Sequence, residues 1–242
     1  MNDLKAVKLT KSDLQTPSPE NEVAPFPFWE SSKEDFLSHF SNGRYIKINK
    51  NAYLFRENDP PQGIFCICEG VSKLARTGKN GKEYIIRFAQ PGDWLGVSGI
   101  YHGTHISDAV AIEPVKSFFV PKDEFIRFLN RNSQFSLNVM KILCDEIEKA
   151  ENRITALAQK TARERVAEIL LNLQQVYGID NNKYLNILLT RKDLANFVGI
   201  SNATLSRLMS DFQRKKLIRI KNKKIRLLDL KKLSTLARIA AV

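Results

Sequence analysis

The sequence predicts an α+β protein in which a domain of short antiparallel strands precedes one long helix and a small basic domain. Three observations support this prediction. Short strand-like runs fill the first half of the chain, apolar residues at three- and four-residue steps follow, and the excess positive charge lies in the last quarter. We therefore divide the chain into residues 1–25, 26–130, 131–160 and 161–242.

The composition is that of an ordinary globular protein, because 43% of the 242 residues are hydrophobic and 26% are charged. The sequence contains no apolar run that could cross a bilayer, and its first residues lack the apolar core of a signal peptide. We therefore expect a cytoplasmic protein without membrane association. The three cysteines have no C-x-x-C spacing, so we expect reduced thiols in structural roles and no metal site.

Residues 1–25 are polar and contain three prolines, which is typical of a flexible tail. Strand-like runs then occur at 44–48, 52–56, 63–70, 71–76, 83–89 and 115–120. Turn residues separate these runs, and no long helix lies between them. This pattern predicts an antiparallel barrel or sandwich over residues 26–130.

After Pro121 the periodicity becomes helical, with a short helix over 122–132 and a long one over 133–160. Apolar residues recur along the long helix and are interrupted by Glu151: Leu137, Met140, Cys144, Ile147, Ile154 and Ala158. This apolar face either packs on the chain's own strand domain or pairs with a second copy in a parallel coiled coil. Periodicity alone does not separate these two alternatives.

The charge distribution is strongly asymmetric along the chain. Residues 181–242 contain 15 lysines and arginines but only three aspartates, whereas residues 1–180 contain 23 basic and 23 acidic residues. A neutral body with a basic module indicates a polyanion partner, most often nucleic acid and less often an anionic membrane.

The basic module carries a helix-turn-helix pattern at about residues 190–213. Thr190 and Asp193 form a helix start, Gly199 ends that short helix, and Ser201 is a good N-cap for the next helix. In the second helix Leu205, Leu208 and Phe212 have core spacing, which leaves Asn202, Ala203, Ser206, Arg207 and Gln213 exposed. Two basic strands around a Lys221–Lys224 turn then predict a β-hairpin, the wing of a winged helix.

The chemistry of these residues suits double-stranded DNA. Arg207 can donate two hydrogen bonds to guanine, Asn202 can pair with adenine, and hydroxyls and lysines can bind phosphates. The predicted DNA-binding residues are Thr190, Arg191, Lys192, Ser201, Asn202, Ala203, Thr204, Ser206, Arg207, Lys221, Lys223 and Lys224.

Over roughly residues 30–230 the chain resembles the Crp/Fnr superfamily of bacterial transcription regulators. The resemblance is carried by the strand series "FRENDPPQGIFCICEGVSKLARTGKNGKEYIIRFAQPGDWLG", by the long helix followed by "ARERVAEILL", and by "LTRKDLANFVGISNATLSRLMSDFQRKKLI". It implies a jelly-roll-like β-roll that is similar to a cyclic-nucleotide-binding domain, and a homodimer joined through the long helix. It also implies a palindromic operator and RNA polymerase as a partner. The Ser206–Arg207 pair looks like the Fnr branch, whereas Ala203 replaces a glutamate that is common in the family.

The resemblance also locates an effector pocket in the stretch "PGDWLGVSGIYHGTHISDAVA". Relatives that bind cyclic nucleotides hold the ligand with a glycine–glutamate pair and an arginine followed by serine or threonine. Here the corresponding residues are Gly96 and Val97, then His105 or Ile106 depending on a one-residue gap, and Ser107; Ser98 adds a neutral donor. Both charged ligands are absent, so we expect a degenerate or repurposed pocket that does not bind cyclic AMP.

The resemblance to the Crp/Fnr superfamily does not identify the effector. An iron–sulfur centre of the Fnr type needs cysteines near the N-terminus, and no cysteine precedes Cys66. We therefore predict no cofactor. The sequence also has no nucleophile–base pair, Walker loop or HExxH motif, so we predict no catalytic residues and no enzyme. The alternative function is a ligand-binding module whose basic C-terminal region binds RNA or an anionic surface.

Overall fold

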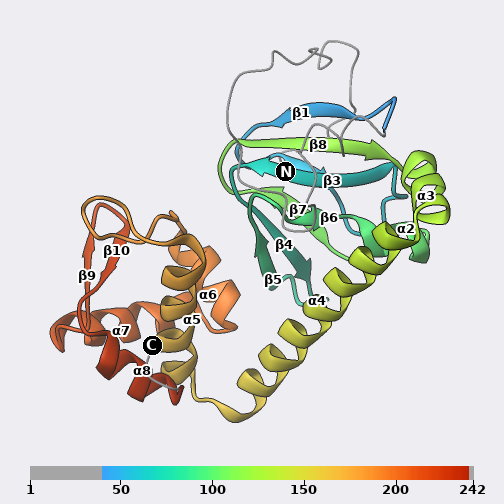
Figure 1. Ribbon diagram of the computed structural model, residues 1–242. Helices are drawn as coiled ribbons and strands as arrows, with labels where there is room; N and C mark the ends of the chain where they lie inside the picture. The colour runs from blue at the N-terminus through green and yellow to red at the C-terminus, as the bar shows by residue number, and fades with distance from the viewer. Residues whose placement is uncertain (1–39, 240–242) are drawn as a thin grey trace. The chain divides into compact units, whose positions relative to one another are not determined.

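The computed structural model describes residues 40–239, so the predicted tail of residues 1–25 lies outside the described residues. The chain forms two compact units that divide inside the long helix, between Cys144 and Asp145 (Figure 1). The long helix therefore contributes to both units.

The first unit consists of two four-stranded antiparallel sheets with short helices, which confirms the predicted strand domain. Its elements are β1 (Arg44–Ile48), β2 (Tyr53–Phe55), β3 (Gly63–Glu69), β4 (Ser72–Thr77), β5 (Glu83–Ala89), β6 (Trp94–Leu95), α2 (Val97–His102), β7 (Asp108–Ala111), β8 (Val115–Pro121) and α3 (Lys122–Arg131). The strand orders are β1-β8-β3-β6 and β2-β7-β4-β5. Apart from the β4–β5 hairpin, the neighbouring strands of these two sheets are not consecutive in sequence, as in a roll.

Two apolar clusters form the core of the first unit. One includes Ile64 and Phe118 from the sheet and Phe125 from α3, and the other includes Ile67, Leu95 and Phe119. Cys66 and Cys68 are 1% and 2% exposed in the first of these clusters, in agreement with their predicted structural role.

The sequence pattern did not predict α2 or β7. Residues 97–102 form a helix between two left-handed glycines, Gly96 and Gly103. Six residues make fewer than two helical turns, which is too short to show a 3.6-residue period, so sequence periodicity misses this helix.

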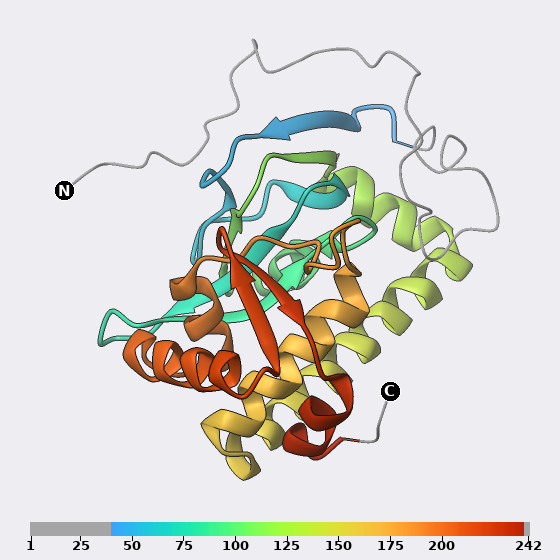
Figure 2. The ribbon, with the colours of Figure 1, turned by 90° about the vertical axis from the view of Figure 1, so that its left-hand side faces the viewer.

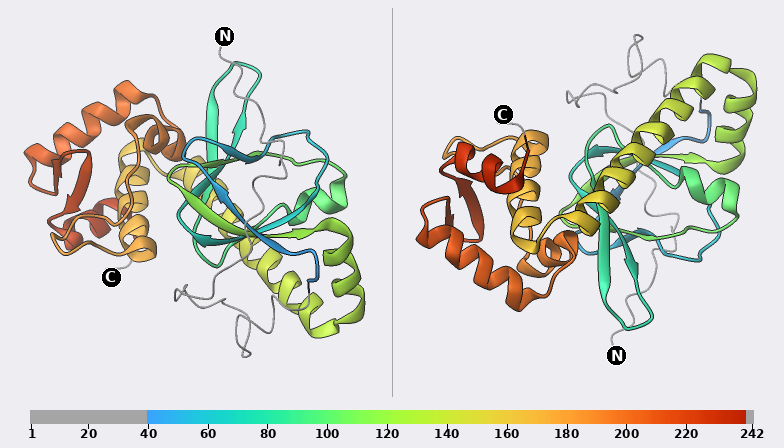
Figure 3. Two further views of the ribbon diagram at one scale, coloured as in Figure 1. Left: turned by 90° about the horizontal axis from the view of Figure 1, so that it is seen from above. Right: turned by 90° about the horizontal axis from the view of Figure 1, so that it is seen from below.

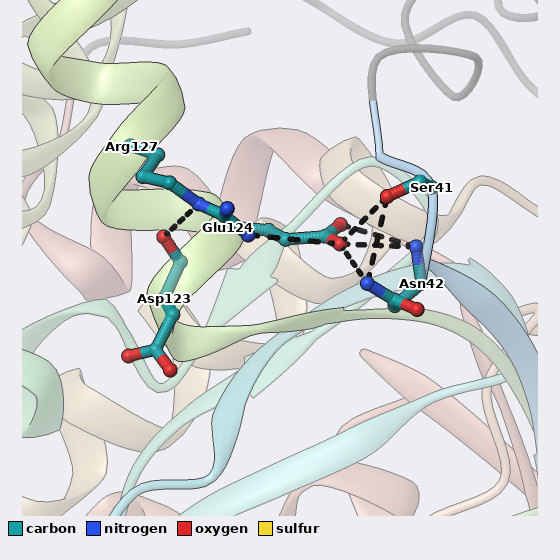
Figure 4. A network of polar contacts seen from close by, with 5 residues as sticks. All are labelled: Ser41, Asn42, Asp123, Glu124 and Arg127. Atoms are coloured by element: carbon teal, nitrogen blue, oxygen red, sulfur yellow. Dashed lines mark hydrogen bonds and ion pairs between the residues drawn. The ribbon is translucent and has the colours of Figure 1, made fainter.

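The segment before β1 is held to α3 by a buried carboxylate (Figure 4). Glu124 accepts hydrogen bonds from the Ser41 hydroxyl at 3.0 Å and from the Asn42 backbone N–H at 3.1 Å. The Asn42 side-chain amide also donates to it. Burial opposes ionisation of Glu124, but these donors and Arg127 lower its pKa below the ordinary value.

The helix α4 (Ser133–Gln159) is continuous over 27 residues (Figure 3). Its first turns pack on the first unit through Phe135 and Val139, which are 3% and 6% exposed. The Phe135 ring lies 4.7 Å from that of Phe128 and 5.5 Å from that of Trp94, measured between centroids.

The second unit holds the predicted winged helix. Besides the end of α4 it contains α5 (Ala162–Tyr177), α6 (Arg191–Val198), α7 (Asn202–Arg214), β9 (Ile218–Lys221), β10 (Lys224–Leu227) and α8 (Leu230–Ala237). Thr161 and Glu164 form a reciprocal capping box at the start of α5. Figure 2 shows the β9–β10 hairpin beside the helices of this unit. None of the helices between residues 40 and 239 is long and apolar enough to cross a membrane.

Candidate nucleic-acid interface

The helix pair α6–α7 has the predicted helix-turn-helix form. The Thr190 side chain accepts from the Asp193 N–H at 3.0 Å, and that of Ser201 accepts from the Thr204 N–H at 3.1 Å. Between the helices Gly199 adopts φ 77° and ψ 42°, a left-handed conformation that favours glycine. Both helix starts and the turn between them therefore follow from local sequence chemistry.

The helix α7 presents one apolar and one polar face. Leu205, Met209 and Phe212 are at most 1% exposed, whereas Leu208 is only half-buried. Met209 thus fills the core position that we assigned to Leu208, because a 3.6-residue helix places i+4 as well as i+3 on one face. The predicted exposed residues are all on the surface: Asn202, Ala203, Ser206, Arg207 and Gln213.

The hairpin β9–β10 pairs Lys224 with Lys221 and turns through Asn222 and Lys223. Both turn residues have positive φ, 50° and 66°, as a two-residue type I′ turn requires. All three predicted lysines of the wing are exposed.

One wing lysine is engaged within the unit. The Lys224 ammonium lies 2.7 Å from a carboxylate oxygen of Asp180, in the loop after α5. Hydrogen bonds from Lys224 and from the Tyr184 N–H lower the pKa of Asp180. Sequence reasoning missed this role of Asp180, since 44 residues separate the two partners.

A second acidic residue ties α7 to α5. Asp211 accepts hydrogen bonds from Arg214 at 2.6 Å and from Arg163 at 2.5 Å, and Lys215 lies 3.3 Å away. The hydrogen bond from Arg214 is the largest cause that lowers the pKa of Asp211 to about 2, with further contributions from Lys215 and Arg163. Asp211 therefore stays ionised at neutral pH and joins α7 to α5.

The predicted apolar face of α4 is exposed in the single chain. Leu137, Met140, Ile147 and Ile154 are 52–65% exposed, and Cys144 and Ala158 are also exposed. The helix residues that pack on the strand domain, Phe135 and Val139, lie outside this series. The members of this series that lie in the first unit, Leu137, Met140 and Cys144, are thus exposed rather than packed on its strands.

The residues assigned to the effector pocket surround the start of α2. Gly96 has φ 95° and directly precedes the helix. Val97 and Ser107 are 7% and 4% exposed, while Ser98 is exposed and Ile106 is 44% exposed. Neither position proposed for a charged ligand therefore carries a charged group at neutral pH.

His105 fills the space beside the glycines. Its ring stacks on Phe55 with centroids 3.8 Å apart, and it is 4% exposed. A methyl group at Gly99 would lie 2.7 Å from its Nδ1 atom, so Gly99 makes room for the imidazole. Burial lowers the pKa of His105, and the nearby Asp59 opposes this only partly. The net result is a lowered pKa, so the ring is neutral at neutral pH, unlike an arginine clamp.

Among residues 40–239 no group of three or more His, Cys, Asp or Glu side chains could hold a metal ion. The strand β6 lies in the stretch assigned to the pocket, and Arg87 is the cation nearest to it in sequence. Arg87 donates to the Trp94 carbonyl at 3.3 Å and lies 3.5 Å from a carboxylate oxygen of Asp93. Its charge is thus matched by a carboxylate within the domain.

Two family models match the chain. Residues 45–132 match the cyclic nucleotide-binding domain, and residues 164–236 match the Crp-like helix-turn-helix domain. Electron transport regulator A of Shewanella oneidensis is 30% identical over 192 residues, covering 78% of this chain and 77% of that protein. Transcriptional activatory protein AadR of Rhodopseudomonas palustris is 28% identical over 198 residues, covering 80% of this chain and 81% of that protein.

Solved structures share the fold. FixK2 from Bradyrhizobium japonicum superposes with a TM-score of 0.73 at 22% identity, over 83% of this chain and 98% of that one. A Crp/Fnr-family regulator from Thermus thermophilus superposes with a TM-score of 0.70 at 22% identity, over 82% of this chain and 100% of that one. The matching relatives are regulators rather than enzymes, as predicted. With both domains matched and the α+β architecture in place, the chain belongs to the Crp/Fnr family of transcription regulators.

Proposed function

We propose that the chain acts as a homodimer that binds a palindromic operator through two copies of α7. The observation that carries this proposal is the exposed polar face of α7, with Asn202, Ala203, Ser206 and Arg207, inside a region of net charge +12. A helix fits the major groove, and a basic surround supplies the phosphate contacts that position it. Arg207 reads a guanine, and the methyl group of Ala203 makes an apolar contact with an adjacent base, such as one to a thymine methyl group.

The predicted phosphate contacts fall into three groups. Arg191, Lys192, Lys221 and Lys223 are exposed, whereas the hydroxyls of Thr190, Ser201 and Thr204 take part in helix caps. Lys224 forms the third group, because its ammonium already contacts Asp180, which offsets part of its charge. We therefore assign the main electrostatic contribution to the first group.

Binding to duplex DNA is tested by selecting sequences from a random duplex pool and measuring affinity for the selected site. We expect Arg207→Ala to weaken binding about 30-fold or more, because two bidentate contacts to guanine are lost, one for each copy, and each contributes about 1–3 kcal/mol. Lys79→Ala, at an exposed turn of the first unit, is the matched control and should leave affinity unchanged. Failure to enrich any sequence, together with equal binding to RNA, would favour the alternative of an RNA-binding module.

Homodimer formation rests on the exposed apolar face of α4. In a parallel helix pair the same core position from each copy meets at the two-fold axis. Cys144 lies on this face and is exposed, whereas Cys66 and Cys68 are buried. Oxidation with copper phenanthroline should therefore join two copies through Cys144, and Cys144→Ser should abolish the product. A monomer by sedimentation at micromolar concentration would overturn the homodimer.

The effector region supports a regulator that does not bind cyclic AMP. Val97 replaces a carboxylate, and the neutral, stacked His105 replaces a cation. Calorimetry with cyclic AMP and cyclic GMP should show no binding in the micromolar range. Micromolar binding would contradict this part of the proposal. As a regulator of transcription, the protein would act in the cytoplasm with RNA polymerase as a further partner.

A further inference from the structure

The C-terminal end of α6 is held by two arginines from other helices. Arg153, on α4, donates to the Phe197 carbonyl, and its guanidinium lies 3.9 Å from the centroid of the Phe197 ring. Arg165, on α5, donates to the Val198 carbonyl at 3.2 Å and to the Lys160 carbonyl at 2.7 Å. Cations at a helix C-terminus satisfy its last carbonyls and interact favourably with the helix dipole.

These contacts lie directly before the turn that leads to the recognition helix. Gly199 and Ile200 both donate to the Ala195 carbonyl, and Ser201 then caps α7. Because the turn is short and hydrogen-bonded, the orientation of α6 fixes that of α7. A side chain that holds the end of α6 therefore also holds the exposed face of α7.

Arg153 is adjacent on α4 to Ile154, which is 65% exposed on the apolar face assigned to the homodimer. Consecutive residues on a helix point about 100° apart. One turn of α4 therefore contacts the chain's own α6 through Arg153 and carries Ile154 on the homodimer face. Arg153 is half-buried, in keeping with a role inside the unit.

We propose that Arg153 is a positioning residue that fixes the helix-turn-helix on α4 and thereby sets the spacing between the two recognition helices of the homodimer. This inference rests on the proposed function. Arginine suits the role because its planar guanidinium can stack on the ring and donate to the carbonyl at the same time. Lysine keeps the charge but lacks the planar group.

The test uses full-length protein and duplexes that contain two selected half-sites at the selected spacing or with one or two base pairs added or removed. Wild type should prefer one spacing strongly. Arg153→Ala should bind that spacing about tenfold more weakly, the cost of a charged hydrogen bond and a cation–π contact. It should also discriminate less among spacings, and Arg153→Lys should fall between the two.

Two measurements separate positioning from other roles. The salt dependence of binding should keep its slope in Arg153→Ala, whereas loss of a phosphate contact in both copies would reduce the slope by about 1.8. Dimerisation should also stay unchanged, as for Lys149→Ala, an exposed α4 control whose ammonium lies 3.5 Å from a carboxylate oxygen of Glu146. If Arg153→Ala fails to fold, Phe197→Leu is used instead, because it removes the ring contact while keeping the carbonyl. A weaker spacing preference in Phe197→Leu would then support the positioning role, and an unchanged one would overturn it.

Unchanged spacing preference in a folded, dimeric variant would overturn the inference, as would a reduced salt slope. The proposed function fails in a different way: wild type would then bind none of the selected duplexes, or Arg207→Ala would bind them as well as wild type does.

Discussion

At the scale of single residues, the glycines around α2 serve a buried histidine. Gly99 leaves the space that the His105 ring occupies, and Phe55 covers its face. The sequence showed the missing glutamate and arginine, but not whether His105 or Ile106 pointed inward. That choice depends on packing across the roll, which a single sequence does not display.

His105 should make the stability of the protein depend on pH. Its folded-state pKa lies below the ordinary value of 6.5, so the unfolded chain binds more protons as the pH falls below that value. The free energy of unfolding should therefore decrease between pH 7.5 and pH 5.5. His105→Gln should reduce this decrease in denaturant titrations, and the exposed His102→Gln should not. An equal pH response in all three proteins would contradict the assignment.

Glu124 should stabilise the start of the strand domain in a separate pH range. In Glu124→Gln the neutral amide replaces the carboxylate that accepts hydrogen bonds from Ser41 and Asn42. We therefore expect the free energy of unfolding to fall by about 1–3 kcal/mol. Because the folded pKa lies below the ordinary 4.5, the wild-type contribution is present above that pH and is lost as the pH falls through the lower, folded value. Urea unfolding at pH 7 and pH 3.5 measures both effects. The exposed Glu148→Gln serves as the control, and a loss of the same size there would rule out this role.

At the scale of secondary-structure elements, local chemistry made the helix-turn-helix predictable. The caps at Thr190 and Ser201 and the left-handed Gly199 all follow from residues within a few positions. The contacts that orient these helices were not predictable. Arg163–Asp211 and Arg153–Phe197 join residues 48 and 44 positions apart, and periodicity carries no information at that range.

Gly199→Ala should disturb both stability and DNA binding. An alanine in the left-handed conformation costs about 1–2 kcal/mol, and relaxing that strain would tilt α7. Thermal unfolding and affinity for the selected duplex measure the two effects. Gly81→Ala is the matched control, with positive φ and open space in the first unit. Gly81→Ala should lower the thermal stability to a similar extent as Gly199→Ala but should leave the affinity of the folded protein for DNA unchanged. Equal DNA affinity in Gly199→Ala and wild type would contradict the role of the turn.

Glu151 should weaken the homodimer that the apolar face of α4 forms. It stands four residues after Ile147 and three before Ile154, at a core position of the repeat, where two carboxylates would face each other. Glu151→Leu should tighten the dimer about tenfold or more, since it removes the repulsion and adds buried apolar area. Sedimentation equilibrium measures this change. The exposed Glu148→Leu lies off this series and should have little effect. A weaker dimer in Glu151→Leu would contradict the assigned register.

At the scale of the whole molecule, the excess positive charge of the chain lies in the last part of the second unit, which forms the helix-turn-helix and the wing. Residues 1–180 carry equal numbers of basic and acidic residues, and residues 181–242 carry the net charge of +12. This asymmetry, visible in the sequence alone, already favoured a polyanion partner. The structure adds that the basic region forms a winged helix whose exposed helix face is polar.

The most direct test of the central claim is the affinity and stoichiometry of full-length protein on a selected palindromic duplex, measured over a range of salt concentrations. We expect two chains per duplex, affinity that falls steeply with salt, and weaker binding by Arg207→Ala with the salt slope changed by at most about two, one for each copy. One chain per duplex, or equal affinity for unrelated duplexes with no effect of Arg207→Ala, would contradict it.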